Sequence, residues 1–474
     1  MKKIILLALV FAMIISIVAC GQKQTPPTAV DNITNSNSNS VTPPVNLPEQ
    51  TPDEKQSALL SGMAPAAFSP YDAPAHVTED YPFQSLTVSF NTDVIVPEVM
   101  AYSVVKMQKR ALTHDELFAI VNLLADTTSG VYGKWEASKD QWKGWLDEAE
   151  QHKDEKWIDR GYIDFLRNCY NAAEEKVSHE PIDSASIVQG AAEQTFYVPS
   201  QDGITAHKFQ VFADGFIYSA NAVSAGNTSL QTDVILKRNI GEFRSNDETR
   251  EQYLWRSPGE PSLSQEEAYE QAAKLLRNMG FSDLALCYAE PCSLIDRQVN
   301  KTTGWAFTFT RDVTGLNTQD EMLLGSSFIS NDATPAYFAP WDRERVIIAM
   351  AKDGVRSVTV RGISRIVDTE FESVQLLTFD VMQECIAENL NKMYAQMYAD
   401  NPYMKGIIEV TSVSLSTSMI ADNGQTDEGY YVPSWIVNYT IKMNESEDLV
   451  GQIIFNAADG SYIEPRMTAQ DLGR

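Results

Sequence analysis

Histidine is scarce in this sequence, and none occurs in its second half. The 474 residues contain five histidines: His76, His114, His152, His179 and His207. The sequence also lacks the His-Glu-x-x-His, Gly-x-Ser-x-Gly, Walker and Gly-x-Gly-x-x-Gly patterns. A histidine-based hydrolase is therefore disfavoured. We predict a protein that is not an enzyme and that needs no cofactor or metal.

Basic residues are also few. The chain has 37 Lys and Arg against 64 Asp and Glu, which gives a formal net charge of −27 at pH 7. Binding to a phosphate backbone requires clustered Lys and Arg, so nucleic acid is not expected as a partner. Hydrophobic residues make up 43% and charged residues 21%, close to the globular average. We therefore expect folded domains rather than a disordered chain or a polytopic membrane protein.

Cysteine is rare as well, with only five in the chain: Cys20, Cys169, Cys287, Cys292 and Cys385. In an exported protein, Cys287 and Cys292 are close enough in sequence to close a small disulfide across a turn, and the spacing leaves this open. No second Cys or His pair lies nearby to complete a metal site. We interpret Cys169 and Cys385 as small apolar core residues.

The N-terminus has the pattern of a bacterial lipoprotein signal. Lys2 and Lys3 precede an apolar run over residues 4–15, which is too short to span a bilayer. Residues 17–21, Ile-Val-Ala-Cys-Gly, resemble the lipobox, in which the signal is cut before a lipidated cysteine. The resemblance implies that residues 1–19 are removed and that Cys20 carries acyl chains. Two such chains anchor a protein stably. We expect a lipid-anchored protein on the extracellular face of the cell membrane.

A flexible tether is predicted for residues 20–82. The segment is rich in Pro, Asn, Ser and Thr, and residues 35–40 alternate Asn with Ser. It has no periodic apolar face, so it cannot bury enough surface to offset the entropy of ordering. We interpret it as a disordered stalk.

Three segments have the signature of a helix start. Thr113 with Glu116 and Ser264 with Glu267 form capping-box patterns, and Thr378 precedes a third apolar stripe. Strand-like runs follow each start, and each series includes an Asp-Gly hairpin signal, at residues 214–215, 353–354 and 459–460. The fold class predicted is α+β, with tandem modules of a helix packed on an antiparallel sheet over residues 83–245, 246–370 and 371–474.

Residues 135–176 interrupt the first module and are predicted to form a helical hairpin. Ser138 with Gln141 offers another capping box. The candidate ligand-binding aromatics Trp135, Trp142 and Trp145 lie in this segment. Their rings either stack on sugars, fill a groove of a partner, or pack between the helices, and the pattern favours packing.

The chain resembles a group of uncharacterised lipoproteins of Gram-positive bacteria. The similarity lies in the Ala19-Cys20 junction and in residues 264–268, 344–358, 376–380, 430–439 and 456–460. A helix followed by strands is also similar to the small exported modules related to PepSY and to extracellular regulators of sensor kinases. This resemblance implies binding and modulation of partners without catalysis, and it brings no functional residues with it.

Our leading hypothesis is a non-catalytic protein-binding or regulatory lipoprotein at the cell envelope. It predicts attachment to the membrane through Cys20 and an envelope protein as partner. One alternative is a lipoprotein that captures glycans or peptides through the tryptophans near residue 142. A second alternative is an envelope hydrolase that uses paired carboxylates, which the abundance of acidic residues does not distinguish.

Overall fold

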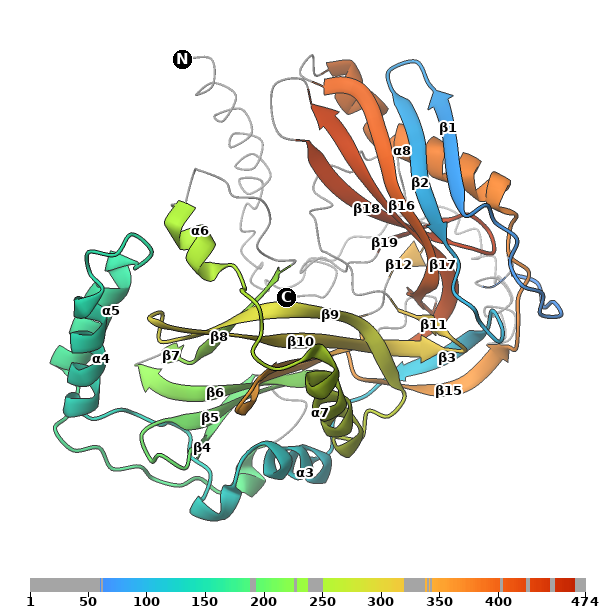
Figure 1. The fold of residues 1–474 in the computed structure, drawn as a ribbon. Helices are drawn as coiled ribbons and strands as arrows, with labels where there is room; N and C mark the ends of the chain where they lie inside the picture. The colour runs from blue at the N-terminus through green and yellow to red at the C-terminus, as the bar shows by residue number, and fades with distance from the viewer. Residues whose placement is uncertain are drawn as a thin grey trace, which may run out of the picture. The chain divides into compact units, whose positions relative to one another are not determined.

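The structure is a computed structural model that describes residue 60 and residues 63–187, 193–225, 228–237, 250–318, 337–338, 341, 343–400, 404–422, 427–443 and 448–464. The predicted signal, Cys20 and most of the predicted tether lie outside these residues. The tether was predicted to extend too far, because Leu60 and Met63 are buried in the core and residues 76–82 form a strand of a sheet. The described chain is a mixed α+β fold, as expected, and its strands form two sheets (Figure 1). Among the described residues, no helix is both long and apolar enough to cross a membrane.

The first sheet joins strands from both ends of the described chain. Its order is β1 (His76–Pro82), β2 (Thr87–Ile95), β16 (Met404–Ala421), β17 (Glu428–Met443), β18 (Leu449–Asn456), β19 (Tyr462–Glu464) and β12 (Tyr337–Phe338). β3 (Val104–Lys109) pairs with β17 and also with β15 (Ser364–Phe371). Most neighbours are antiparallel, but β2 runs parallel to β16, and β12 runs parallel to β19.

The second sheet is formed by the middle of the chain. Its order is β4 (Gln194–Pro199), β5 (Ala206–Phe212), β6 (Gly215–Ala225), β14 (Gly354–Arg361), β13 (Arg345–Ala351), β10 (Asn300–Val313), β9 (Leu284–Asp296) and β8 (Thr232–Leu236). Two short strands extend it, β7 (Thr228–Leu230) on β6 and β11 (Leu316–Asn317) on β10.

The helices predicted to follow Thr113, Ser138, Ser264 and Thr378 are present, whereas the helix over residues 250–256 was not predicted. The helices are α3 (His114–Leu124), α4 (Lys139–Gln151), α5 (Arg160–Ala172), α6 (Arg250–Arg256), α7 (Gln265–Asn278) and α8 (Phe379–Asp400), with short 3-10 turns at Thr127–Ser129 and Ser184–Ser186. Complete capping boxes start α3 at Thr113, α4 at Ser138 and α7 at Ser264. Each box satisfies backbone N–H groups that the first helical turn leaves without partners.

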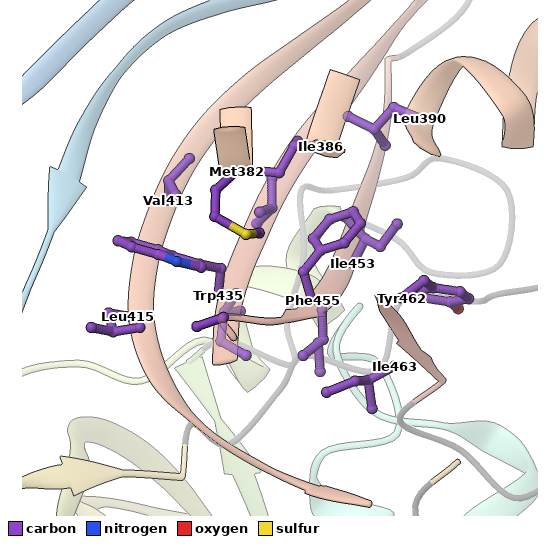
Figure 2. Packing of buried hydrophobic residues seen from close by; sticks show 14 of the residues in the cluster. Met382, Ile386, Leu390, Val413, Leu415, Trp435, Ile453, Phe455, Tyr462 and Ile463 are labelled. Carbon is purple, nitrogen blue, oxygen red and sulfur yellow. The ribbon is translucent and has the colours of Figure 1, made fainter. Parts of the chain in front are cut away.

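Helix α8 packs on the first sheet through the stripe predicted from its period. Met382, Ile386 and Leu390 are fully buried, and they belong to one core cluster with Trp435 and Phe455 of the sheet (Figure 2). Burial of a side chain of this size stabilises the fold by about 1.5 to 3 kcal/mol. The apolar face of α8 therefore holds the helix on β17 and β18.

Helices α3 and α7 share the second sheet. Leu117 of α3 and Ala272 of α7 are fully buried in one cluster with Phe209 of β5 and Phe307 of β10. Two helices that the sequence assigns to different modules thus cover one continuous sheet, because β6 pairs directly with β14.

The strands of the three predicted modules do not form three separate sheets. β2 and β3 were expected in the first module but pair with β16 and β17 of the third. β15 was expected in the second module but pairs with β3. The boundaries at residues 245 and 370 therefore do not divide the sheets. Strand edges need partners for their backbone N–H and C=O groups, and the partner is decided by tertiary packing rather than by distance along the chain.

The disulfide suggested by the spacing of Cys287 and Cys292 is excluded by their position. Both residues lie on the single strand β9, with no turn between them. Five residues of extended chain separate their Cα atoms by ~16 Å. A disulfide requires Cα atoms within about 7 Å. On the neighbouring strand β10, Gly304 lies directly opposite Cys292.

A buried ion pair connects the two sheets. Arg311 of β10 and Glu344, which precedes β13, are each only 2% exposed. Arg311 Nε donates to Glu344 Oε2 at 2.7 Å. Ser364, the first residue of β15, donates its backbone N–H to Glu344 Oε1 at 3.0 Å, and its carbonyl accepts from Arg311 Nη2 at 3.2 Å. Since β15 pairs with β3, the ion pair ties the second sheet to a strand of the first.

We predict that Glu344→Gln lowers the free energy of unfolding by about 3 kcal/mol, because it leaves the Arg311 guanidinium buried without its main counter-charge. Urea unfolding followed by circular dichroism measures the change. The matched control is Asp147→Asn, which removes the exposed pair with Lys143 and should change stability by less than about 0.5 kcal/mol. Equal unfolding midpoints for Glu344→Gln and the wild type would contradict this role.

A second prediction concerns Gly304 on β10. A Cβ at this position would meet the backbone carbonyl of Met350 and the side chain of Leu294. We expect Gly304→Ala to lower the thermal midpoint, at a cost of about 2 kcal/mol, because the neighbouring strand would have to move. Gly144→Ala is the control, since Gly144 is exposed on α4 with open space around it and alanine favours a helix. A stabilised Gly304→Ala variant would show that the strands are not in this register.

Candidate functional site around helices α4 and α5

Helices α4 and α5 lie side by side next to one end of the second sheet (Figure 1). Their buried side chains form one hydrophobic cluster with Ala222 of β6. The residues that the two helices contribute to it are Trp142, Ala149, Tyr162, Ile163 and Leu166. On the surface, Arg167 of α5 pairs with Glu150 of α4 at 2.5 Å. α5 begins at Arg160 after an Asp159 cap, and Trp157 lies in the loop before it.

The Trp135 side chain packs inside the protein. Its side chain is 7% exposed, and its Nε1–H donates to the carbonyl of Ile204 at 3.2 Å. The ring stacks on His179 with centroids 3.8 Å apart and planes 10° apart. One face of the indole is therefore covered by an imidazole. Trp135 is a packed residue rather than an open platform for a sugar.

Trp142 and Trp145 form a perpendicular pair with centroids 5.0 Å apart. Trp142 is 3% exposed, so it too packs between the helices and the sheet, which is the arrangement that the sequence pattern favours. Trp145 is half-buried, and the guanidinium of Arg297 lies 5.5 Å from its ring centroid. Of the three candidate aromatics, only Trp145 lies partly open to solvent.

A hollow of about 370 Å³ lies beside the loop between α4 and α5. Its lining residues carry charges of both signs, and one of them, Gln252, lies on α6. They are Lys153, Asp154, Glu155, Lys156, Ile158, Asp159, Arg160 and Gln252. Next to these residues in sequence, Trp157 stacks on Trp255 of α6, with centroids 4.5 Å apart and planes 8° apart. Sequence reasoning did not single out Trp255, because a lone tryptophan in a short helix has no pattern that indicates its partner.

A second group of polar residues surrounds the turn between β9 and β10. Arg297 and Gln298 have φ of 48° and 52°, which is uncommon for residues other than glycine. Arg297 Nη2 pairs with Asp296 Oδ2 at 3.1 Å. Burial raises the pKa of the Asp296 carboxyl, while the charge of Arg297 acts in the opposite direction. Within the described residues, no group of three or more His, Cys, Asp or Glu side chains is arranged to hold a metal ion.

Comparisons with known proteins leave the family open. No family model and no curated protein matches the sequence. An uncharacterised protein from Eubacterium rectale ATCC 33656, known from a crystal structure, is 12% identical with a TM-score of 0.43, over 83% of this chain and 94% of that one. The Bacillus megaterium YpeB C-terminal domain is 12% identical with a TM-score of 0.20, over 65% of this chain and 96% of that one. At these TM-scores neither likeness establishes a shared fold.

We predict that His179 takes up a proton at lower pH than His76. Burial lowers its pKa below the ordinary 6.5, with Glu136 acting weakly in the opposite direction. Its neutral form therefore favours the folded state above pH 6.5, and this contribution is lost as the pH falls through the folded-state pKa. NMR titration of the imidazole C–H signals measures the titration midpoints of His179 and His76.

The reference in the same spectrum is His76, whose pKa is raised by hydrogen bonds with Asp93 and Asn91. His179→Gln assigns the signal. A His179 midpoint at or above that of His76 would show that the ring is not held against Trp135.

Proposed function

We propose that this protein is a membrane-anchored extracellular lipoprotein that binds an envelope protein without catalysing a reaction. The lipobox-like residues 17–21 support lipid attachment at Cys20, and the Pro-, Asn- and Ser-rich composition of residues 21–59 supports a tether. Together they would hold the folded part outside the membrane but next to it. The proposed partner is another protein of the same envelope, such as a sensor.

We further infer that the folded part contains three related units of one helix and an antiparallel meander. α3 is followed by β4, β5 and β6; α7 by β9, β10, β13 and β14; and α8 by β16, β17, β18 and β19. In each series the consecutive strands named are antiparallel neighbours. α4 and α5 would then be a helical hairpin inserted between α3 and β4. This order supports the resemblance to PepSY-related modules.

The binding surface that we propose consists of the Trp157–Trp255 pair and the neighbouring hollow. Tryptophan is enriched at the energetic centres of protein interfaces. The hollow beside it is lined mainly by charged side chains, including Lys153 and Glu155, as in the polar rim around such a centre. Leu254, also on α6, is 57% exposed. This grouping of a stacked tryptophan pair with a mixed-charge hollow is the observation that carries the proposal.

The net charge indicates the kind of partner. At −27 the chain attracts basic protein surfaces over a Debye length and repels acidic ones. Electrostatic attraction of this kind mainly accelerates association, so the complex should form more slowly as salt is raised.

The test is recovery of partners from membranes. The full-length protein is crosslinked in cells, solubilised in detergent and isolated, and the proteins enriched with it are measured by mass spectrometry. We expect a specific envelope protein with the wild type and at least a tenfold lower recovery with Trp157→Ala, because loss of an interface centre costs about 2 kcal/mol or more.

Tyr288→Ala is the matched control. Tyr288 is an aromatic residue 39% exposed on β9, and its removal should leave recovery unchanged. Equal recovery with Trp157→Ala and the wild type, or no enriched protein with either, would overturn the proposal. Release of a Cys20→Ala variant into the medium tests the anchor separately.

A further inference from the structure

Strand β1 is an open edge of the first sheet (Figure 1). Among the described residues it pairs only with β2, in a register that runs from His76 opposite Asp93 to Pro82 opposite Thr87 without a bulge. Edge strands are usually kept from pairing with other chains by bulges, by short length or by a covering element. β1 is regular over seven residues, so its outer side is a template for one more strand.

The backbone groups on this outer side can be assigned. The Val94 N–H donates to the carbonyl of Ala75 at 3.0 Å, directly before β1. Successive residues of an antiparallel strand point their N–H and C=O groups to opposite sides, so every second residue from Ala75 onward bonds to β2. The N–H and C=O groups of His76, Thr78 and Asp80 therefore point away from β2. All three residues are exposed, which leaves these groups accessible.

Helix α8 lies beside this edge on one face of the sheet (Figure 1). Gln383 of α8 donates from Nε2 to Glu79 Oε2 of β1 at 3.0 Å, which fixes the helix against the strand. Asp380 lies three residues before Gln383 on the same side of the helix, and it is exposed. A strand added to β1 would therefore have one face toward α8. A groove between an edge strand and a helix is a known position for an extended peptide.

The side chains around the edge are acidic. They include Glu79 and Asp80 of β1 and Asp380 and Glu384 of α8, whereas neither β1 nor residues 379–386 contain Lys or Arg. Burial, followed by the negative charges of Glu79, Glu384 and Asp380, raises the pKa of Tyr81 on β1 to about 12. The charge favours a basic occupant. A second copy of this chain would bring the same acidic residues to the contact, and like charges opposite each other are unfavourable.

We propose that β1 binds an extended basic segment of a partner protein as an additional antiparallel strand. The bound residues opposite His76, Thr78 and Asp80 make the backbone hydrogen bonds, and their side chains lie on the face away from α8. The residues between them face α8 and carry the Lys or Arg side chains, next to Glu79 and Asp380. The site goes beyond the Trp157–Trp255 surface, shares no residue with it and does not depend on it.

The probe is an eight-residue peptide of alternating lysine and valine with blocked ends and a fluorescent label. It is titrated with the full-length protein, purified in detergent, and binding is measured by fluorescence anisotropy. We expect at least tenfold weaker binding when glutamate replaces lysine. N-methylation of the valines, which removes the N–H groups that face β1, should also weaken binding at least tenfold. N-methylation of the lysines is the matched control and should have a smaller effect, because those N–H groups point to solvent.

Two variants of the protein test the edge itself. Thr78→Pro removes one outward N–H without breaking the ladder to β2 and should weaken binding at least fivefold, whereas Thr78→Ala keeps the N–H and should bind within about twofold of the wild type. Asp380→Asn should weaken binding about threefold. Its control is Glu266→Gln, which removes an exposed acid from the first turn of α7 on the other sheet and should leave the affinity unchanged.

Thermal midpoints confirm that each variant is folded, and the N-methylated peptides carry the test on the wild type if Thr78→Pro is not. No binding of the basic peptide, equal binding of the acidic peptide, or equal effects of the two N-methylations would overturn the proposal. Unchanged affinity of folded Thr78→Pro would do the same. A dimer of the wild type in sedimentation that Thr78→Pro dissociates would assign the edge to a second copy instead.

Discussion

The arrangement of the strands depends on the buried ion pair of Arg311 and Glu344. A guanidinium taken out of water must be matched by a nearby charge and by hydrogen bonds, and here the matching groups are Glu344, before β13, and Ser364 of β15, which also bond to each other. Only one relative position of β10, β13 and β15 supplies them together. β10 in turn sets the register of β9, so the pair also determines where the turn at Arg297 lies.

The aromatic residues divide into those that build the protein and those that remain available to other molecules. Trp135, Trp142 and Trp435 are buried, with partners from their own chain. The Trp157–Trp255 pair that we propose for recognition lies in a loop and on the short helix α6. Loops are the usual position of binding residues, because their backbone does not have to complete a core. The proposed protein-binding surface follows that division.

Local patterns in the sequence predicted the elements well but predicted the site poorly. Thr113, Ser138 and Ser264 start helices because a capping box is complete within four residues. The Asp353-Gly354 turn joins β13 and β14 because Gly354 takes a positive φ of 121° without strain. By contrast, Trp157 and Trp255 of the proposed surface are far apart in the chain and carry no shared pattern. The disulfide that the spacing of Cys287 and Cys292 left open is excluded by the structure, because spacing alone does not distinguish a turn from a strand.

The sequence by itself determined the class of fold, the capped starts of α3, α4 and α7, the strand-forming runs and the excess of negative charge, since each depends on neighbouring residues or on composition. Tertiary structure alone decided that β2 and β3 join the strands that follow α8, that α3 and α7 cover one sheet, and that Trp157 stacks on Trp255. These choices depend on which backbone edges and apolar faces remain uncovered once the elements form, and many residues distant in the chain satisfy that requirement equally well until they are packed together.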